Sequence, residues 1–271
     1  MLECAALSDL VVDCSGYSNK TLIIKESIMK AAVIRGTQKI VVEDIPTPEP
    51  GPNQVLVKIK YSALCGSDVH RFQYGMANEG SVLGHEYTGE VVQTGRCVTL
   101  LNEGDRVISG GGEPPIGTVP PLFSGERYSA RTVGIEATRI GGFAEYVAMD
   151  EWRPLLVPEG VSDELAVLAE PASIAVHAVR TSIFKIGDQT VVMGAGPIGL
   201  LVIQVLKAAG AAAIYVSEPA SARAESARVL GADLVLNPME DDVVARVLEL
   251  SGGPGVPVAF DAAAARSTFQ Q

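Results

Sequence analysis

The stretch VVMGAGPIGLL, residues 191–201, places three glycines between a β-prone run and an apolar helical run. Gly194, Gly196 and Gly199 have the spacing G-x-G-x-x-G. In such a loop the first glycine makes a tight turn, the second lets the backbone approach a pyrophosphate, and the third allows close helix–strand packing. Pro197 and Ile198 would open the helix, whose free N–H groups face the phosphates. The stretch therefore predicts a dinucleotide-binding loop.

Strand and helix patterns alternate around this loop. Further β-prone runs are AIYVSE (213–218), LVLN (234–237) and VPVAFDA (256–262), with helical segments between them. This alternation predicts a parallel, doubly wound sheet. A full dinucleotide-binding sheet has about six strands. We therefore expect a C-terminally incomplete chain that, as it stands, binds its dinucleotide poorly and turns over slowly.

Two residues bear on the choice of dinucleotide. Glu218 ends the second β-run, where a carboxylate can accept hydrogen bonds from the ribose hydroxyls of NAD and would repel a 2′-phosphate. Arg223 follows within a helical turn and can attract that phosphate. We therefore expect both residues at the cofactor site, with NAD favoured and NADP as the less favoured alternative.

The first half of the chain has a different pattern. From Met29 to about residue 160, short β-prone runs are separated by Pro, Gly and Asn, which predicts a closed or partly closed β-barrel. A helical pattern follows, with Ser162 or Asp163 as N-cap and Pro171 as a break. We expect domains at 29–171 and 172–271, and interpret residues 1–28 as a leader or misassigned start.

Composition excludes some kinds of partner. The net charge of −11 does not favour nucleic acid or an anionic membrane, because both attract clustered Lys and Arg. The most apolar stretch, in residues 197–214, is interrupted by polar residues and is too short for a membrane span. Four cysteines without a secretory signal suggest a reducing compartment. We therefore expect a cytoplasmic protein.

Candidate metal ligands are scattered through the sequence. A catalytic zinc needs about three protein ligands drawn from Cys, His, Asp and Glu. Cys65 lies in CGSDVH (65–70), His85 and Glu86 in a glycine-flanked turn, and Glu170 in an apolar run. A solitary cysteine is more often a buried small hydrophobe, and the others also have structural interpretations. The residues alone leave both readings open.

Six motifs, taken together, carry a family resemblance. They are CGSDVH (65–70), GHEYTGEV (84–91), GDRV (104–107), GGFAEYV (141–147), AEPASIAVHAV (169–179) and GAGPIGLL (194–201). In this order they resemble the zinc-dependent medium-chain alcohol dehydrogenases, most of all the polyol, butanediol and threonine dehydrogenases. The resemblance runs from Met29 to Gln271. It implies a GroES-like catalytic barrel followed by a Rossmann-type domain.

The resemblance also implies roles for the candidate residues. Cys65 and His85 would be zinc ligands, and Glu86 and Glu170 would complete the coordination shell or exchange in it. Asp68 would accept a hydrogen bond from a ligand imidazole and fix its orientation.

A proton path is implied on the same helix. Ser67 would touch the substrate oxygen, and His70 would end a relay to solvent, a task typical of histidine.

The expected reaction moves a hydride between a secondary alcohol, polyol or vicinal diol and NAD. Residues 108–142, where many relatives hold a structural zinc with four cysteines, contain no cysteine, so one catalytic zinc is expected. The full-length protein would be a homo-oligomer that acts on a small alcohol or ketone. The alternatives are a zinc-free quinone or enoyl reductase of the same superfamily, and a non-catalytic dinucleotide-binding protein.

Overall fold

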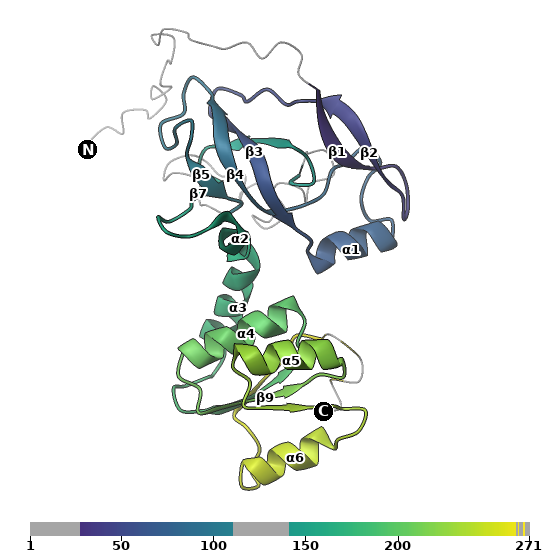
Figure 1. The fold of residues 1–271 in the computed structure, drawn as a ribbon, viewed down its shortest axis with the longest axis vertical. Coiled ribbons are helices and arrows are strands. Elements are labelled where there is room, and N and C mark those ends of the chain that lie inside the picture. The colour runs from purple at the N-terminus through teal and green to yellow at the C-terminus, as the bar shows by residue number, and fades with distance from the viewer. Residues whose placement is uncertain (1–27, 111–140, 264, 266–267, 269–271) are drawn as a thin grey trace, which may run out of the picture. The chain divides into compact units, whose positions relative to one another are not determined.

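Two compact units divide the chain, residues 1–168 and 169–271 (Figure 1). The computed structural model describes residues 28–110, 141–263, 265 and 268. The expected leader therefore lies outside the described residues, apart from Ile28. The division between the units falls close to the boundary expected at residue 171.

In the described residues of the N-terminal unit, antiparallel strands combine with two short helices. A two-stranded sheet pairs β1 with β2, and a five-stranded sheet has the order β6-β3-β4-β5-β7. Bridges from β1 to Val82 and Ala144 link it to other parts of the unit. The elements are β1 (Ile28–Ile34), β2 (Ile40–Pro46), β3 (Gln54–Ala63), α1 (Gly66–Gln73), β4 (Glu86–Thr94), β5 (Arg106–Ile108), β6 (Tyr146–Asp150), β7 (Leu155–Leu156) and α2 (Asp163–Ala166).

Alternation along the strands builds the core of this unit. Val55 and Val57 on β3 are fully buried, and so is Val147 on β6. They pack with Tyr87 and Val107, among others, in one apolar cluster. Val55 and Val57 lie two residues apart on β3, so they share the face that packs in this cluster.

The tip of the β1–β2 hairpin closes the end of α1. Gln38 donates its backbone N–H to Phe72 O at 3.1 Å and its side-chain Nε2–H to Gln73 O at 3.2 Å. It has a φ of 56°, the one positive φ among the non-glycine residues that the structure describes. The last carbonyls of a helix lack intrahelical partners, so the hairpin satisfies two of them. This contact fixes the C-terminal end of α1.

The helical segment after residue 160 differs from the expectation in one respect. Ser162 is the N-cap of α2, accepting the Leu165 N–H at 3.3 Å, as predicted. The predicted break at Pro171 is wrong, because Pro171 lies in the first turn of α3 (Ala169–Thr181). A proline is tolerated there since the first N–H groups of a helix need no intrahelical partner. The interruption falls earlier, between Ala166 and Ala169.

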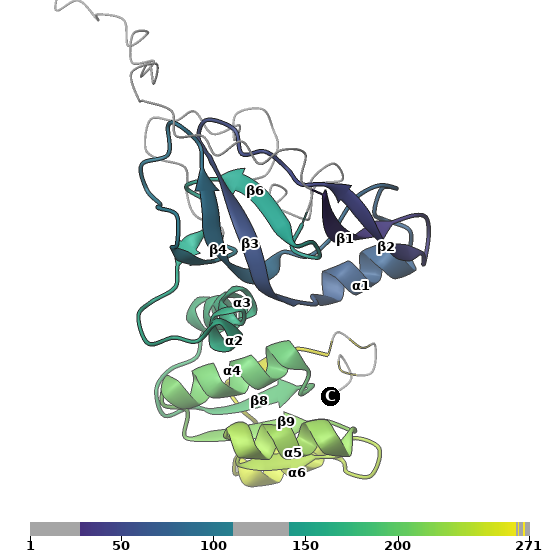
Figure 2. The ribbon, with the colours of Figure 1, turned by 45° about the horizontal axis from the view of Figure 1, so that its top comes forward.

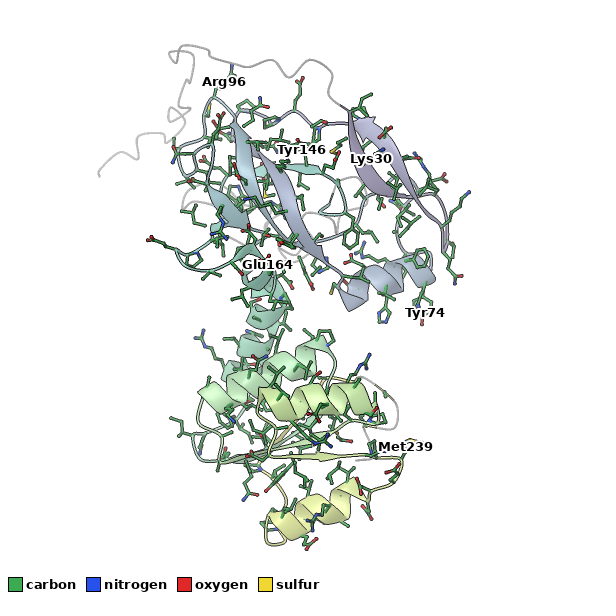
Figure 3. All side chains as sticks on the ribbon, in the orientation of Figure 1. Lys30, Tyr74, Arg96, Tyr146, Glu164 and Met239 are labelled. Atoms are coloured by element: carbon green, nitrogen blue, oxygen red, sulfur yellow. The ribbon has the colours of Figure 1, made fainter. Side chains whose placement is uncertain are left out.

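An ion-pair network fastens α2 to the sheet. Arg106 on β5 donates from Nη2 to Asp163 Oδ1 at 2.6 Å and to Val161 O at 2.8 Å. On β3, the Tyr61 hydroxyl donates to Glu164 at 2.6 Å, and this bond raises the pKa of Tyr61 and lowers that of Glu164. Figure 3 labels Glu164 on this helix. The arginine of GDRV thus anchors the segment that leads to the second unit.

Replacing Arg106 by methionine should lower the free energy of unfolding by about 1–2 kcal/mol, because charge-assisted bonds to Asp163 and Val161 are lost from a half-buried site. Chemical denaturation measures the change. The matched control is Arg246→Met, which removes an exposed pair with Glu249 and should cost less than about 0.5 kcal/mol. Equal costs for the two variants would contradict the anchoring role.

The C-terminal unit is a parallel sheet with helices on both faces. Its strand order is β10-β9-β8-β11, with every pair parallel. This is the predicted four-strand series, in the order typical of dinucleotide-binding folds. Besides α3, the elements are β8 (Gln189–Met193), α4 (Pro197–Ala208), β9 (Ala213–Ser217), α5 (Ser221–Leu230), β10 (Leu234–Leu236), α6 (Val243–Leu250) and β11 (Val258–Asp261).

The two faces of this sheet pack in separate layers. Val192 and Val216 point to the layer of α3, α4 and α5, whereas Val191 and Tyr215 pack with Val247 of α6. The views in Figures 1 and 2 show α4 and α6 on opposite faces. Strands buried on both faces read as continuous apolar runs, which explains QTVVM and AIYVS.

Candidate functional site: a metal-ligand cluster and a glycine loop

Three predicted metal ligands meet in the N-terminal unit. One ligand atom from each of Cys65, His85 and Glu86 lies within 4.8 Å of the others. The register of β3 and β4 pairs Ala63 with Glu86, so the turn that follows β3 arrives beside the start of β4. Cys65 is half-buried, and His85 and Glu86 are each 5% exposed. Strand pairing therefore assembles the cluster from residues far apart in the sequence.

The backbone conformation of Gly84 positions His85 in this cluster. Gly84 has a φ of 97°, a conformation that L-residues with a side chain rarely adopt. A Cβ at this position would also come within 2.8 Å of the backbone N of Phe143. Both constraints require glycine immediately before His85.

Asp68 holds the two ligand-bearing loops together. It is 2% exposed, and its carboxylate accepts the Cys65 N–H at 3.2 Å and the Gly84 N–H at 3.4 Å. Oδ1 also lies 3.6 Å from Nδ1 of His85. The sequence interpretation gave Asp68 a role toward the imidazole alone. The two backbone bonds add a second role, since they connect the residue before α1 with the turn before β4.

The chemistry of the donors fits zinc. Thiolate sulfur, imidazole nitrogen and carboxylate oxygen are the donors that zinc prefers, and catalytic sites use about three of them and keep one position open. The ligand atoms of Cys65, His85 and Glu86, all within 4.8 Å of one another, would hold such an ion.

The thiol of Cys65 keeps its proton to a higher pH than the thiol of a free cysteine does. Partial burial raises its pKa, and the charge of Glu86 adds to this effect, against an opposing hydrogen bond with Ser67. Zinc binds the thiolate, so metal binding must release this proton. The cluster should therefore bind zinc more tightly as the pH rises.

The remaining predicted residues of this chemistry lie on two different helices. Ser67 and His70 are exposed and three residues apart on α1, which places them on the same face. The His70 ring lies 5.9 Å from that of Tyr74, which Figure 3 labels. Glu170 lies in the first turn of α3, in the C-terminal unit, and is not one of the three clustered residues. Its ligation of zinc stays a prediction.

In the glycine loop, a different structural constraint applies at each of the three glycines. Gly194 has a φ of 93°, and a Cβ on Gly199 would overlap the carbonyl oxygen of Gly194. Gly196 has an ordinary φ of −72°, and a Cβ there would meet nothing within 4 Å. The turn explains Gly194 and the packing explains Gly199, whereas Gly196 leaves its backbone open to a ligand. Pro197 and Ile198 form the start of α4, with Gly196 as its N-cap.

A cavity of about 350 Å³ opens beside this loop. Gly194, Gly196, Glu218 and Arg223 line it, as the sequence predicted, whereas Pro197, Ile198 and Gly199 are not among its lining residues. The sequence reasoning missed Pro238 and Met239 after β10, and Ala262, Ala263, Ala265 and Thr268 after β11. Figure 3 labels Met239. Their position after parallel strands was the available signal, because ligands bind at the carboxyl ends of such strands.

Further findings concern compartment. No helix in the described part of the chain is long and apolar enough to cross a bilayer. Of the two described cysteines, Cys65 is free and Cys97 is disulfide-bonded. The cytoplasmic location therefore stays a prediction.

Both halves of the chain match known protein families. Residues 51–159 match the alcohol dehydrogenase GroES-like domain, and residues 197–271 match the zinc-binding dehydrogenase family. The fold class predicted from the sequence is thereby confirmed: a GroES-like domain and a Rossmann-type sheet.

Individual relatives agree with the family matches. The chain is 39% identical to (R,R)-butanediol dehydrogenase of Bacillus subtilis over 254 residues, which cover 86% of this chain and 70% of the relative. It is 34% identical to L-threonine 3-dehydrogenase of Pectobacterium carotovorum over 89% of this chain and 72% of the relative. A solved structure from Sinorhizobium meliloti, described as a zinc-binding dehydrogenase bound to NADP, superposes with a TM-score of 0.79 at 30% identity, covering 90% of this chain and 72% of that chain. The chain belongs to the zinc-dependent medium-chain alcohol dehydrogenase family, whose members move a hydride between an alcohol and a nicotinamide dinucleotide.

Proposed function

We propose that this enzyme transfers a hydride between a secondary alcohol, polyol or vicinal diol and NAD, using one catalytic zinc and no structural zinc. The observation that carries the proposal is the cluster of Cys65, His85 and Glu86, whose ligand atoms lie within 4.8 Å. A zinc-free reductase or a non-catalytic binding protein has no need of a half-buried thiol beside a buried imidazole and a buried carboxylate. The similarity to a butanediol dehydrogenase supports the vicinal diol as substrate.

The metal centre and α1 divide the work of alcohol activation. Zinc bound to the cluster supplies Lewis-acid polarisation of the substrate oxygen. Asp68 keeps the His85 ring and the Cys65 turn in place through the contacts described above. Ser67 would contact the substrate oxygen, take the proton of the alcohol and release its own hydroxyl proton toward the exposed His70, which would pass it to solvent. Glu170 is proposed as a further carboxylate that enters the coordination shell.

The cofactor cavity supports NAD over NADP. Glu218 is 4% exposed and lines the cavity, so a 2′-phosphate placed there would lie against a buried carboxylate. Arg223 lines the same cavity and tempers this preference. NAD supplies the hydride acceptor. The full-length enzyme is proposed to be a homo-oligomer, in keeping with the family resemblance.

The test is a single-turnover assay with the chain in excess over the dinucleotide, so that a slow enzyme still gives a full signal. We expect (R,R)-butanediol to reduce NAD at least about tenfold faster than NADP, a difference of about 1.4 kcal/mol in the barrier. The absorbance of the reduced nicotinamide is the readout. Cys65→Ala should abolish the signal, and zinc chelation should do the same.

The opposing result is equally specific. Reduction of a quinone or an enoyl substrate by NADPH that survives both Cys65→Ala and chelation would assign the chain to the zinc-free reductases. Dinucleotide binding without turnover of any alcohol, in a zinc-loaded chain, would favour the non-catalytic alternative.

A further inference from the structure

Glu218 makes contacts that recognition of a ribose does not require. Its Oε2 accepts the N–H of Ala195, in the glycine loop, at 2.8 Å, and its Oε1 accepts the N–H of Ala220 at 2.8 Å. We propose that Glu218 is a positioning residue that holds the glycine loop in its binding conformation before any dinucleotide arrives. The inference rests on the proposed dinucleotide binding and adds a structural role to the expected cofactor contact.

The glycine loop needs such an acceptor. Ala195 is fully buried, so without Glu218 its N–H would be buried without a hydrogen-bond acceptor, which is unfavourable. The preceding residue, Gly194, has a φ of 93° and donates its N–H to Ser217 O at 2.8 Å. The loop is therefore held to the end of β9 at two consecutive residues. The second of these bonds depends on a side chain.

Glu218 is itself firmly placed. Its backbone N–H donates to Leu236 O of β10 at 3.0 Å, and its bond to Ala220 fixes the turn that leads into α5. One residue thus connects the ends of β8, β9 and β10, the edge where the cavity lies. A carboxylate has about four acceptor positions, so the bonds to the two alanine amides leave positions for ribose hydroxyls.

This arrangement affects cofactor specificity. Replacing Glu218 by a small neutral residue removes the repulsion toward a 2′-phosphate, and it also removes the acceptor for Ala195. The loop that receives the pyrophosphate of either dinucleotide then loses its support. We therefore expect such a variant to bind both NAD and NADP more weakly, with no gain for NADP.

The experiment is amide hydrogen exchange on the dinucleotide-free chain, with Glu218→Gln and Glu218→Ala compared with the wild type. We expect the Ala195 amide to exchange at least about tenfold faster in Glu218→Ala, and faster in Glu218→Gln, which keeps a single acceptor oxygen. The Val192 amide in β8 serves as the reference for an intact fold. The matched control is Asp233→Asn, which alters an acid that accepts the Ile214 N–H away from the glycine loop and should leave Ala195 unchanged.

Unchanged exchange at Ala195 in both Glu218 variants would overturn the proposal, and so would tighter NADP binding by Glu218→Ala. Faster exchange at Ala195 with unchanged Val192, together with weaker binding of both dinucleotides, would support it. If Glu218→Ala does not fold, Glu218→Gln gives the same comparison with the side-chain volume kept. The exchange readout needs neither zinc nor turnover, so its failure is distinguishable from failure of the proposed function.

Discussion

Gly199→Ala should strongly destabilise the C-terminal unit, whereas Gly196→Ala, three residues earlier, should fold normally and lose dinucleotide affinity. A methyl group at position 199 would overlap the carbonyl oxygen of Gly194, which is backbone and cannot rotate away. Overpacking of this kind costs more than about 3 kcal/mol, a large share of the stability of a domain. Thermal unfolding and circular dichroism measure the effect.

The Gly196 variant isolates the role of the ligand. The φ of −72° at Gly196 suits any residue, and a Cβ there would have free space in the protein. We therefore expect the added methyl group to clash only with a bound dinucleotide. We expect a dissociation constant for NAD at least about tenfold higher, by calorimetry, with at most about 1 kcal/mol lost from folding because alanine is a poorer N-cap than glycine. Wild-type affinity in this variant would show that the pyrophosphate does not approach Gly196.

Cys65→Ala should abolish zinc binding. The wild-type chain should hold about one zinc, measured by elemental analysis of the purified protein, because the donor set provides about three ligands. Zinc should raise the melting temperature of the wild type by mass action and leave that of Cys65→Ala unchanged. The raised pKa of the thiol gives the sign of the pH dependence: zinc affinity falls as the pH is lowered.

The matched control for the metal site lies on the same strand. Glu90 is four residues beyond Glu86 on β4, and its carboxylate pairs with Lys60 at 3.1 Å rather than with the cluster. Glu90→Gln should therefore keep its zinc, and Glu86→Gln should bind zinc more weakly. Retention of zinc by a folded Cys65→Ala variant would show that the metal binds at another site.

Local patterns predicted most of the fold. The apolar β-prone runs and the helical runs after residue 188 predicted four parallel strands in the observed series. The central strands β8 and β9 are apolar throughout because they are buried on both faces. Pro171 misled the same reasoning, because a proline ends a helix only in its interior, and sequence alone did not show where α3 begins.

The sequence predicted the residues of the site but not the hydrogen bonds that hold them in place. Motifs identified Cys65, His85 and Glu86, and strand pairing then brought them together. Asp68 and Glu218 each accept two backbone hydrogen bonds. These bonds depend on how closely separate loops approach one another in the fold, and no local sequence pattern predicts that distance.

The position of the metal ligands in the chain has a consequence for biosynthesis. The three clustered ligands lie between residues 65 and 86, and the last strand of the sheet that supports them ends at Leu156. The glycine loop begins only at Gly194, in the second unit. Domains fold in order as the ribosome releases them. The nascent chain therefore contains all three clustered candidate ligands before the glycine loop has been synthesised.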